Sequence, residues 1–353
     1  MKVFQKINIC IIRNDKMGDM ILTLPIIKAI KDSYPNTKIT VVCSNINSFL
    51  CEEASFVDEY SVFDKKDKSL SKIKFLRTFR KNSFDFIFNF SQDIETFLLL
   101  LTAKSINKSS LIYLSRYRNP KFSKIFQRLI IKLVGFDNII INRNEFYKKK
   151  LDFHQTGIMY QLVNKKLNIK KPTCFHLFPS EINFKKTFQK RILIHLSDRW
   201  IDHEYCEDMF LKLLSKLEKK YGKLYLTTDH SSHKSFQKIY ELYKKFNNSE
   251  LYKVYKSNQS IIILDKLNFK NWRNVIINSK LVITYECGCV HVASMSDVPL
   301  LVVYDYKNKP NMIHKEYAPL TTNYQKVITN QKQINAEVMR KLEKMKSSNL
   351  DMI

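Results

Sequence analysis

The residue with the clearest chemical potential is Asp19, within the segment Arg13-Asn14-Asp15-Lys16-Met17-Gly18-Asp19. It follows an apolar run at residues 7–12 and opens a run with helical spacing, so we expect it at the carboxyl end of a strand. Open α/β sheets bind ligands at that edge, where a carboxylate can accept a proton from an attacking hydroxyl. The alternative is that Asp19 only caps the helix, a position where aspartate is common.

A second segment, residues 194–200, consists of the end of an apolar run followed by polar residues. Its Ser197 and Arg199 are suited to phosphate oxygens, the arginine as a fixed cation with a planar fork. A surface loop that carries one of many basic residues is the alternative.

A third segment, residues 283–293, combines a strand, a glycine turn and a helix start. Gly288 is one of only 5 glycines in the chain, and Gly18 occupies the corresponding turn before Asp19. Backbone N–H groups in such a turn favour a diphosphate, and His291 adds a donor one turn into the helix. A purely structural turn with a hydrogen-bonded histidine is the alternative.

The first half of the chain alternates strand-like and helix-like runs, as in a doubly wound parallel sheet. Strands are predicted at residues 7–12, 38–43, 85–90 and 110–114, and helices at 19–34, 69–81, 93–104 and 152–167. Residues 171–189 are rich in polar residues without a clear period and are predicted to be a linker.

The alternation starts again after this linker. Strands are predicted at residues 191–196, 223–228, 260–264, 280–284 and 299–304, and helices from residues 204, 232, 269 and 290. A last helix at 334–345 is expected to pack back on the body. The fold class is therefore α/β, with Rossmann-like domains at residues 1–170 and 190–353 facing a cleft where ligands bind.

The composition limits the class of protein and its partners. The chain has 353 residues and a net charge of +27, which favours an anionic partner: nucleic acid, phospholipid headgroups or a phosphorylated substrate. Its 7 cysteines form no C-x-x-C pair, so no metal site is expected. No apolar run has the length of a membrane span or of a signal peptide, and a cytoplasmic protein is expected.

One predicted helix, residues 122–134, has a basic face and an apolar face. Its basic face combines Lys121, Lys124, Arg128 and Lys132. A helix of this kind can lie in a membrane interface, and a helix that packs on the core with a solvated basic face is the alternative.

In their order along the chain, these segments resemble glycosyltransferase family nine, the heptosyltransferase-like enzymes of lipopolysaccharide core biosynthesis. The first segment is similar to the family's opening signature through Arg13, Gly18, Asp19 and the following Thr23-Leu24-Pro25. The third is similar to its donor motif through Gly288, His291 and Ala293, followed by Val298-Pro299. His154 is similar to a residue of the helix that ends the family's first domain.

The resemblance implies a GT-B fold and an inverting sugar transfer that needs neither a metal ion nor a cofactor. Asp19 would be the general base, and the loop with Arg13, Lys16 and Gly18 would lie on the acceptor side. The residues implied in binding the nucleotide-diphosphate donor are Ser197, Arg199, Glu286, Cys287, Gly288 and His291. ADP-heptose is a candidate donor, and the implied acceptor is a phosphorylated glycolipid met at the inner face of the cytoplasmic membrane.

The chain departs from the family where Glu286 and Cys287 replace the usual Asp-Thr pair. The carboxylate is longer by one methylene and a hydroxyl donor is lost, which leaves the donor sugar open. Two other functions stay open beside the enzyme. One is a GT-B relative that binds glycans without catalysis, and the other is a basic nucleic-acid-binding protein, which no motif supports.

Overall fold

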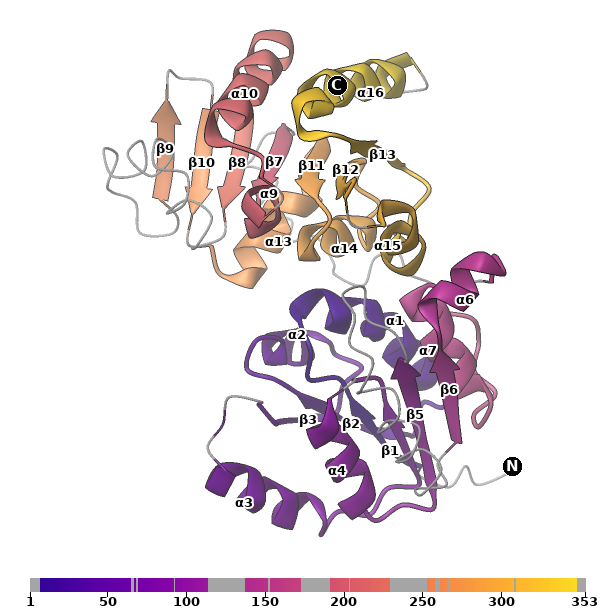
Figure 1. Cartoon of the computed structure of the whole chain (residues 1–353). Coiled ribbons are helices and arrows are strands. Elements are labelled where there is room, and N and C mark those ends of the chain that lie inside the picture. Colours follow the sequence, from indigo (N-terminus) through magenta and orange to yellow (C-terminus); the bar gives the residue numbers. More distant parts are fainter. Residues whose placement is uncertain are drawn as a thin grey trace. The chain divides into compact units, whose positions relative to one another are not determined.

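The computed structural model describes residues 7–64, 67, 69–91, 93–113, 137–151, 153–172, 191–202, 204–228, 253–257, 261–265, 267–307 and 309–347. The chain divides into two compact units. The first comprises Met1–Thr173 and Asn311–Ala318, and the second comprises Cys174–Pro310 and Pro319–Ile353. A short segment from late in the sequence therefore belongs to the first unit. Figure 1 shows that each unit is a sheet covered by helices.

The first unit contains, within the described residues, a six-stranded sheet in which all neighbouring strands are parallel. Its order is β3-β2-β1-β4-β5-β6, so the chain moves outward in both directions from β1. Such a switch point is where open α/β sheets bind ligands. The strands are β1 (Asn8–Ile12), β2 (Lys38–Cys43), β3 (Glu59–Val62), β4 (Phe86–Asn89), β5 (Asn107–Tyr113) and β6 (Asp137–Ile141).

Helix α1 carries the residues that follow β1, and it is buried along most of its length. Its apolar residues from Met20 to Ile30 lie almost completely out of solvent, which fixes the first turn of the helix relative to the sheet. The helices of this unit are α1 (Met17–Ser33), α2 (Ser48–Glu53), α3 (Ser69–Phe79), α4 (Ile94–Thr102), α6 (Arg143–Lys148), α7 (Gln155–Asn164) and α15 (Pro310–Tyr317).

The second unit contains, in the part of the chain that is described, a seven-stranded sheet in the order β13-β12-β11-β7-β8-β10-β9. Every neighbouring pair is parallel except the edge strand β9, which runs antiparallel to β10. The strands are β7 (Ile192–Leu196), β8 (Leu224–Thr228), β9 (Lys253–Ser257), β10 (Ile261–Asp265), β11 (Leu281–Tyr285), β12 (Leu300–Asp305) and β13 (Tyr324–Thr329).

One face of this second sheet packs against α10 and α16. Alternate residues of the strands, such as Ile194 and Ile283, join the apolar faces of both helices and Trp200 in one core. Because α16 supplies four buried residues to this core, the prediction that the last helix packs back on the body is confirmed. The remaining elements are α9 (Asp198–Asp202), α10 (Glu207–Tyr221), α13 (Phe269–Ile277), α14 (Gly288–Ser294), the 3-10 helix η1 (Gln331–Gln333) and α16 (Ile334–Ser347).

The predicted fold class of two doubly wound, Rossmann-like α/β sheets is confirmed. Each predicted strand is present, and the edge strands β3, β6, β9 and β13 are additional. The predicted helices at 122–134 and from residue 232, and the linker from residue 173 onward, lie outside the described residues. The domain boundaries stay a prediction. Among the described residues, no helix combines the length and apolar character that crossing a membrane requires.

Candidate active site

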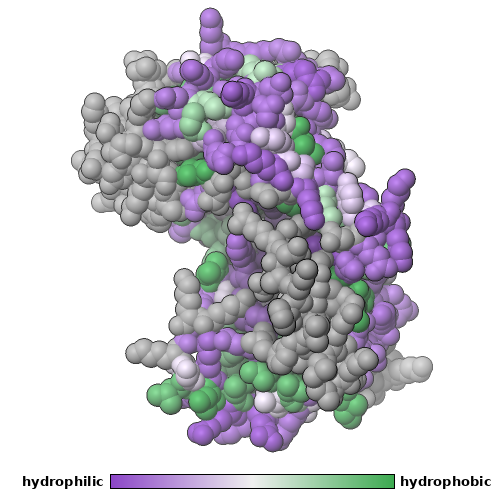
Figure 2. Space-filling model, viewed as in Figure 1, coloured by the Kyte–Doolittle hydropathy of each residue, from purple (hydrophilic) through white to green (hydrophobic). Residues whose placement is uncertain are grey.

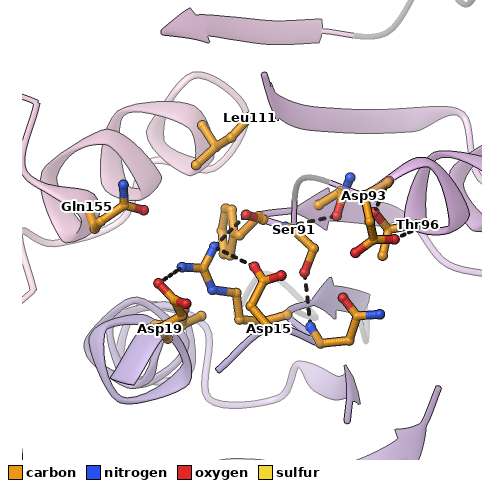
Figure 3. A network of polar contacts seen from close by, with 12 residues as sticks. Asp15, Asp19, Ser91, Asp93, Thr96, Leu111 and Gln155 are labelled. Atoms are coloured by element: carbon orange, nitrogen blue, oxygen red, sulfur yellow. Dashed lines mark hydrogen bonds and ion pairs between the residues drawn. The ribbon is translucent and has the colours of Figure 1, made fainter. Parts of the chain in front are cut away.

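Arg13, directly after β1, organises the candidate active site of the first unit. Its side chain is 1% exposed, and its Nη2 donates a hydrogen bond of 2.9 Å to Oδ1 of Asp19. Nη1 donates to the carbonyl oxygen of Phe90 and lies 3.5 Å from Oδ2 of Asp15. Figure 3 shows the carboxylates of Asp15 and Asp19 directed toward this guanidinium. Arg13 therefore fixes both carboxylates at the carboxyl end of β1.

The carboxylate of Asp19 is held by Arg13 rather than used as a helix cap. Helix α1 begins at Met17, and the N-cap residue is Lys16, whose side chain makes no capping hydrogen bond. The side chain of Asp19 is 21% exposed, and within the described part of the chain its Oδ2 accepts no hydrogen bond. One oxygen is therefore anchored while the other can meet a ligand.

The carboxylates of Asp19 and Asp15 stabilise the positive charge of Arg13. Burial of Arg13 opposes its positive charge, but the carboxylates of Asp19 and Asp15 outweigh that effect and raise its pKa. A buried guanidinium with two carboxylates and a backbone carbonyl is compensated, so Arg13 stays ionised at every physiological pH.

Polar side chains from the neighbouring strand ends hold the loop between β1 and α1. Asn47 donates from Nδ2 to the carbonyl oxygens of Arg13, at 3.1 Å, and of Asp15, at 3.2 Å. Ser91, after β4, accepts a hydrogen bond of 3.0 Å from the backbone nitrogen of Asn14. The loop is thus fixed from both neighbouring strands, β2 and β4, before any ligand binds.

The acceptor-side residues predicted from the sequence occupy different environments. Lys16 is exposed, Gly18 is partly buried in the first turn of α1, and Arg13 is buried beneath the loop. Helix α1 starts two residues before the predicted residue 19, so Gly18 lies in the helix and not in the turn before it. Of the three, Lys16 is the one whose side chain lies in solvent.

A second buried ion pair lies in the same unit. Glu316 of α15 is 0% exposed and accepts hydrogen bonds of 2.7 Å from Nε and from Nη2 of Arg143. Gln155 donates a further bond of 2.7 Å to the same carboxylate and accepts one of 2.8 Å from the hydroxyl of Tyr113. The guanidinium of Arg143 also lies 4.5 Å from the centre of the Tyr113 ring. This network fixes the late segment Asn311–Ala318 to the first unit.

The electrostatics of Glu316 extend to the Arg13 pair. Burial raises the pKa of the Glu316 carboxyl well above its usual value, and the charge of Asp19 also raises it, whereas a hydrogen bond with Tyr317 and the charge of Arg13 lower it. The bidentate contact with Arg143 favours the charged carboxylate, so Glu316 depends on that arginine to stay ionised.

His154, the N-cap of α7, ties the same late segment to this unit. Its Nδ1 accepts a hydrogen bond of 3.3 Å from the backbone nitrogen of Thr156, so the proton of the neutral ring lies on Nε2. Nε2 then donates to the carbonyl oxygen of Ala318 at 3.0 Å. The sequence singled out His154 but not this role.

The predicted donor-binding residues gather at one edge of the second sheet. Strands β7 and β11 are parallel neighbours, with Thr284 paired to His195 in register. Ser197 and Arg199 follow β7, whereas Glu286 and Cys287 follow β11. Both segments therefore leave the sheet at the same carboxyl edge.

Three of these residues lie on or beside short helices. Gly288 is the first residue of α14, and Cys287 is its N-cap. The Sγ atom of Cys287 lies 3.4 Å from Oγ1 of Thr284 and so contacts a hydroxyl near the end of β11. His291 is buried within α14.

Ser197 is buried, and among the described residues its hydroxyl has no hydrogen-bond partner. A buried hydroxyl without a partner costs free energy, and such groups concentrate where a ligand supplies the missing bond. Arg199 is half-buried in α9, two residues after Ser197 in the sequence. The described residues contain no group of three or more histidine, cysteine, aspartate or glutamate side chains that could hold a metal ion.

Two Rossmann-like units with polar side chains at the carboxyl edges of their sheets define the GT-B fold, and the protein is a glycosyltransferase. It belongs to glycosyltransferase family 9 (heptosyltransferase), whose model matches residues 72–346. The match begins after Asp19, so it covers the donor segments but not the loop at the end of β1.

Solved structures of heptosyltransferases are similar to this chain in fold. Escherichia coli heptosyltransferase WaaC with ADP has a TM-score of 0.70 and 14% identity, over 96% of this chain and 100% of that one. A family 9 glycosyltransferase from Veillonella parvula gives 0.69 and 15%, over 96% and 90%. The E. coli ADP-heptose heptosyltransferase II gives 0.66 and 12%, over 96% and 98%. No curated protein matches the chain in sequence.

Proposed function

We propose that this glycosyltransferase moves a sugar, heptose or a related one, from a nucleotide-diphosphate donor to a phosphorylated glycolipid acceptor. The transfer inverts the anomeric carbon and uses no metal ion. The observation that carries the proposal is the Asp19 carboxylate, anchored through Oδ1 to buried Arg13 with Oδ2 available at the switch point of the first sheet. A carboxylate fixed in this way is suited to accept the proton of the attacking acceptor hydroxyl.

The second sheet supplies the donor site in this proposal. Ser197 and Arg199 bind the diphosphate, and the segment from Cys287 to His291 completes the phosphate contacts. Glu286 faces the donor sugar. The structures of WaaC with ADP and with ADP-2-deoxy-2-fluoro heptose support an adenine nucleotide as the first donor to test. No finding favours the nucleic-acid-binding or the inactive glycan-binding alternative.

The donor can be identified by native mass spectrometry of the purified chain with a panel of nucleotide-diphosphate sugars. We expect one adduct that is retained at donor concentrations where the others dissociate. The same adduct should form with Asp19→Asn, since the proposed base does not hold the donor. If no nucleotide sugar of the panel binds, the proposed donor site is wrong.

Arg199→Ala should weaken donor binding about 10- to 150-fold, because a charge-assisted phosphate contact contributes roughly 1.5 to 3 kcal/mol. Titration calorimetry with ADP measures the change. Lys216→Ala on α10 is the matched control. It removes one exposed cation from the same unit, at a position in none of the segments predicted to bind the donor. Equal ADP affinity in all three proteins would show that Arg199 does not contact the donor.

A further inference from the structure

The first unit exposes large aliphatic side chains on helices α3 and α4 and in the segment after α4. They are Leu70 and Ile73 of α3, Leu98 and Leu101 of α4, and Ile106 after α4. Leu70 is 80% exposed and Ile106 is 99% exposed. Figure 2 shows hydrophobic side chains gathered over the part of the first unit where Figure 1 draws α3 and α4, with hydrophilic ones between them. A single exposed leucine is ordinary, but a set on adjacent helices marks an interaction surface.

The helical period explains why these side chains face solvent. Helix α3 turns Phe75, Leu76 and Phe79 toward the core that it shares with α4. At 3.6 residues per turn, Leu70 falls on the opposite side of the helix, whereas Ile73 falls beside Leu76 at the edge of the buried face. Both side chains therefore lie outside the part of the helix that packs on the core.

Exposed cations lie among the aliphatic residues. They are Lys74, Arg77, Arg80, Lys81 and Lys104, and none of them forms an ion pair with a residue that the structure describes. The nearby Glu95 of α4 is already compensated, since its Oε1 lies 2.9 Å from Nζ of Lys72 on α3. This ion pair joins the two helices, and it leaves the surface with an excess of positive charge.

We propose that these five aliphatic and five basic residues, here named the α3–α4 surface, dock the protein on an anionic phospholipid bilayer. The aliphatic side chains enter the boundary between headgroups and acyl chains, and the lysines and arginines meet the lipid phosphates. The charge decides for a bilayer over a protein partner, because the five cations lie on α3, directly after it and after α4, among the aliphatic residues, and complement a uniformly anionic plane.

The surface connects directly to the candidate active site. Asp93 caps α4 by accepting a hydrogen bond of 2.8 Å from the backbone nitrogen of Thr96. Two residues earlier, Ser91 binds the loop that precedes Asp19. Helix α4 is therefore joined at its N-terminal end to the segment that holds this loop. The lipid-linked acceptor of the proposed function would be held in the same membrane. Only this last step rests on the proposed function.

The test uses co-sedimentation of the full chain with vesicles of phosphatidylglycerol and phosphatidylcholine in equal parts, and with phosphatidylcholine vesicles alone. We expect binding to the anionic vesicles that falls as salt rises, and little binding to the neutral ones. The triple variants Leu70→Gln/Ile73→Gln/Ile106→Gln and Lys74→Gln/Arg77→Gln/Lys81→Gln should each lower the binding constant by about 10-fold or more. Glutamine is a good helix former, so α3 keeps its propensity.

The matched control is Lys212→Gln/Lys216→Gln/Lys219→Gln, which removes the same charge from an exposed face of α10 in the second unit. Equal losses in the control and the basic variant, or wild-type binding in both α3–α4 variants, would overturn the proposal. So would a loss confined to a variant of Lys121, Lys124, Arg128 and Lys132. Donor binding and turnover on a soluble acceptor are measured in parallel and should not change, so failure of the docking surface is distinct from failure of the proposed function.

Discussion

Asp19→Asn should lower turnover by roughly 100-fold or more while donor affinity stays near that of the wild type. Asparagine has the same shape, and its carbonyl oxygen can still accept the hydrogen bond that Nη2 of Arg13 donates to Oδ1 at 2.9 Å. It cannot take a proton from the acceptor hydroxyl. Single-turnover kinetics with saturating donor isolates the chemical step from donor binding and product release.

The control for this prediction is Asp15→Asn. Asp15 faces the same guanidinium from 3.5 Å, so its replacement removes an equal charge from Arg13 without touching α1. We expect a much smaller loss of turnover in Asp15→Asn than in Asp19→Asn. A thermal melt of each variant shows whether the fold is retained. Near wild-type turnover in Asp19→Asn would exclude this carboxylate as the base.

Arg143→Met should destabilise the protein by about 3 to 5 kcal/mol, because it leaves the buried carboxylate of Glu316 without its counterion. The native contact is bidentate, with both bonds at 2.7 Å, and Glu316 has no exposed surface. The midpoint of thermal unfolding measures the loss. Arg143→Met/Glu316→Leu removes both charges and should recover most of it, since well-packed apolar residues replace buried ion pairs at little cost.

The loss in Arg143→Met should grow as pH rises. Burial raises the pKa of Glu316 above that of a glutamate in the unfolded chain, about 4.3. In the variant, the free energy of unfolding is therefore highest below about pH 4.3, where Glu316 is neutral in both states. It falls as pH rises through the raised pKa of Glu316 in the folded state. Unfolding midpoints of the single variant should approach those of the wild type near pH 4 and fall below them at neutral pH. A difference independent of pH would contradict the ionisation of Glu316 as its cause.

The sequence predicted the interior strands of both sheets and missed the edge strands. Strand β2 reads Lys-Ile-Thr-Val-Val-Cys, and its residues from Ile39 to Cys43 are buried, so most of its residues are apolar. Edge strand β3 reads Glu-Tyr-Ser-Val with two exposed residues, and β13 mixes Gln325 and Lys326 with Val327. Edge strands bury less and pair on one side only, so their composition resembles that of loops.

The position of Asp19 could be predicted, but its contacts could not. A strand followed by a helix places a residue at the carboxyl edge of a sheet from local pattern alone. The pairing of Asp19 with Arg13 depends on the loop geometry that Asn47 and Ser91 impose from other strands. Polar residues at the ends of β2 and β4 are a signal that could have indicated this support.

The Arg143–Glu316 pair lay beyond any local pattern. Its partners are 173 positions apart in sequence. Neither residue belongs to an element that was predicted, because α6 and α15 are short helices of 6 and 8 residues. Only the folded chain shows that a segment from late in the sequence completes the first unit.

The most direct test of the proposed reaction is whether nucleoside diphosphate is released only when acceptor is present. Purified protein is mixed with the nucleotide sugar that it retains and with a phosphorylated core-type glycolipid, and the mass of the acceptor is followed with time. We predict an increase by one sugar residue and an equimolar release of nucleoside diphosphate, both nearly abolished in Asp19→Asn. An acceptor of unchanged mass with every donor of the panel, in a protein that binds the donor, would contradict the transfer that we propose.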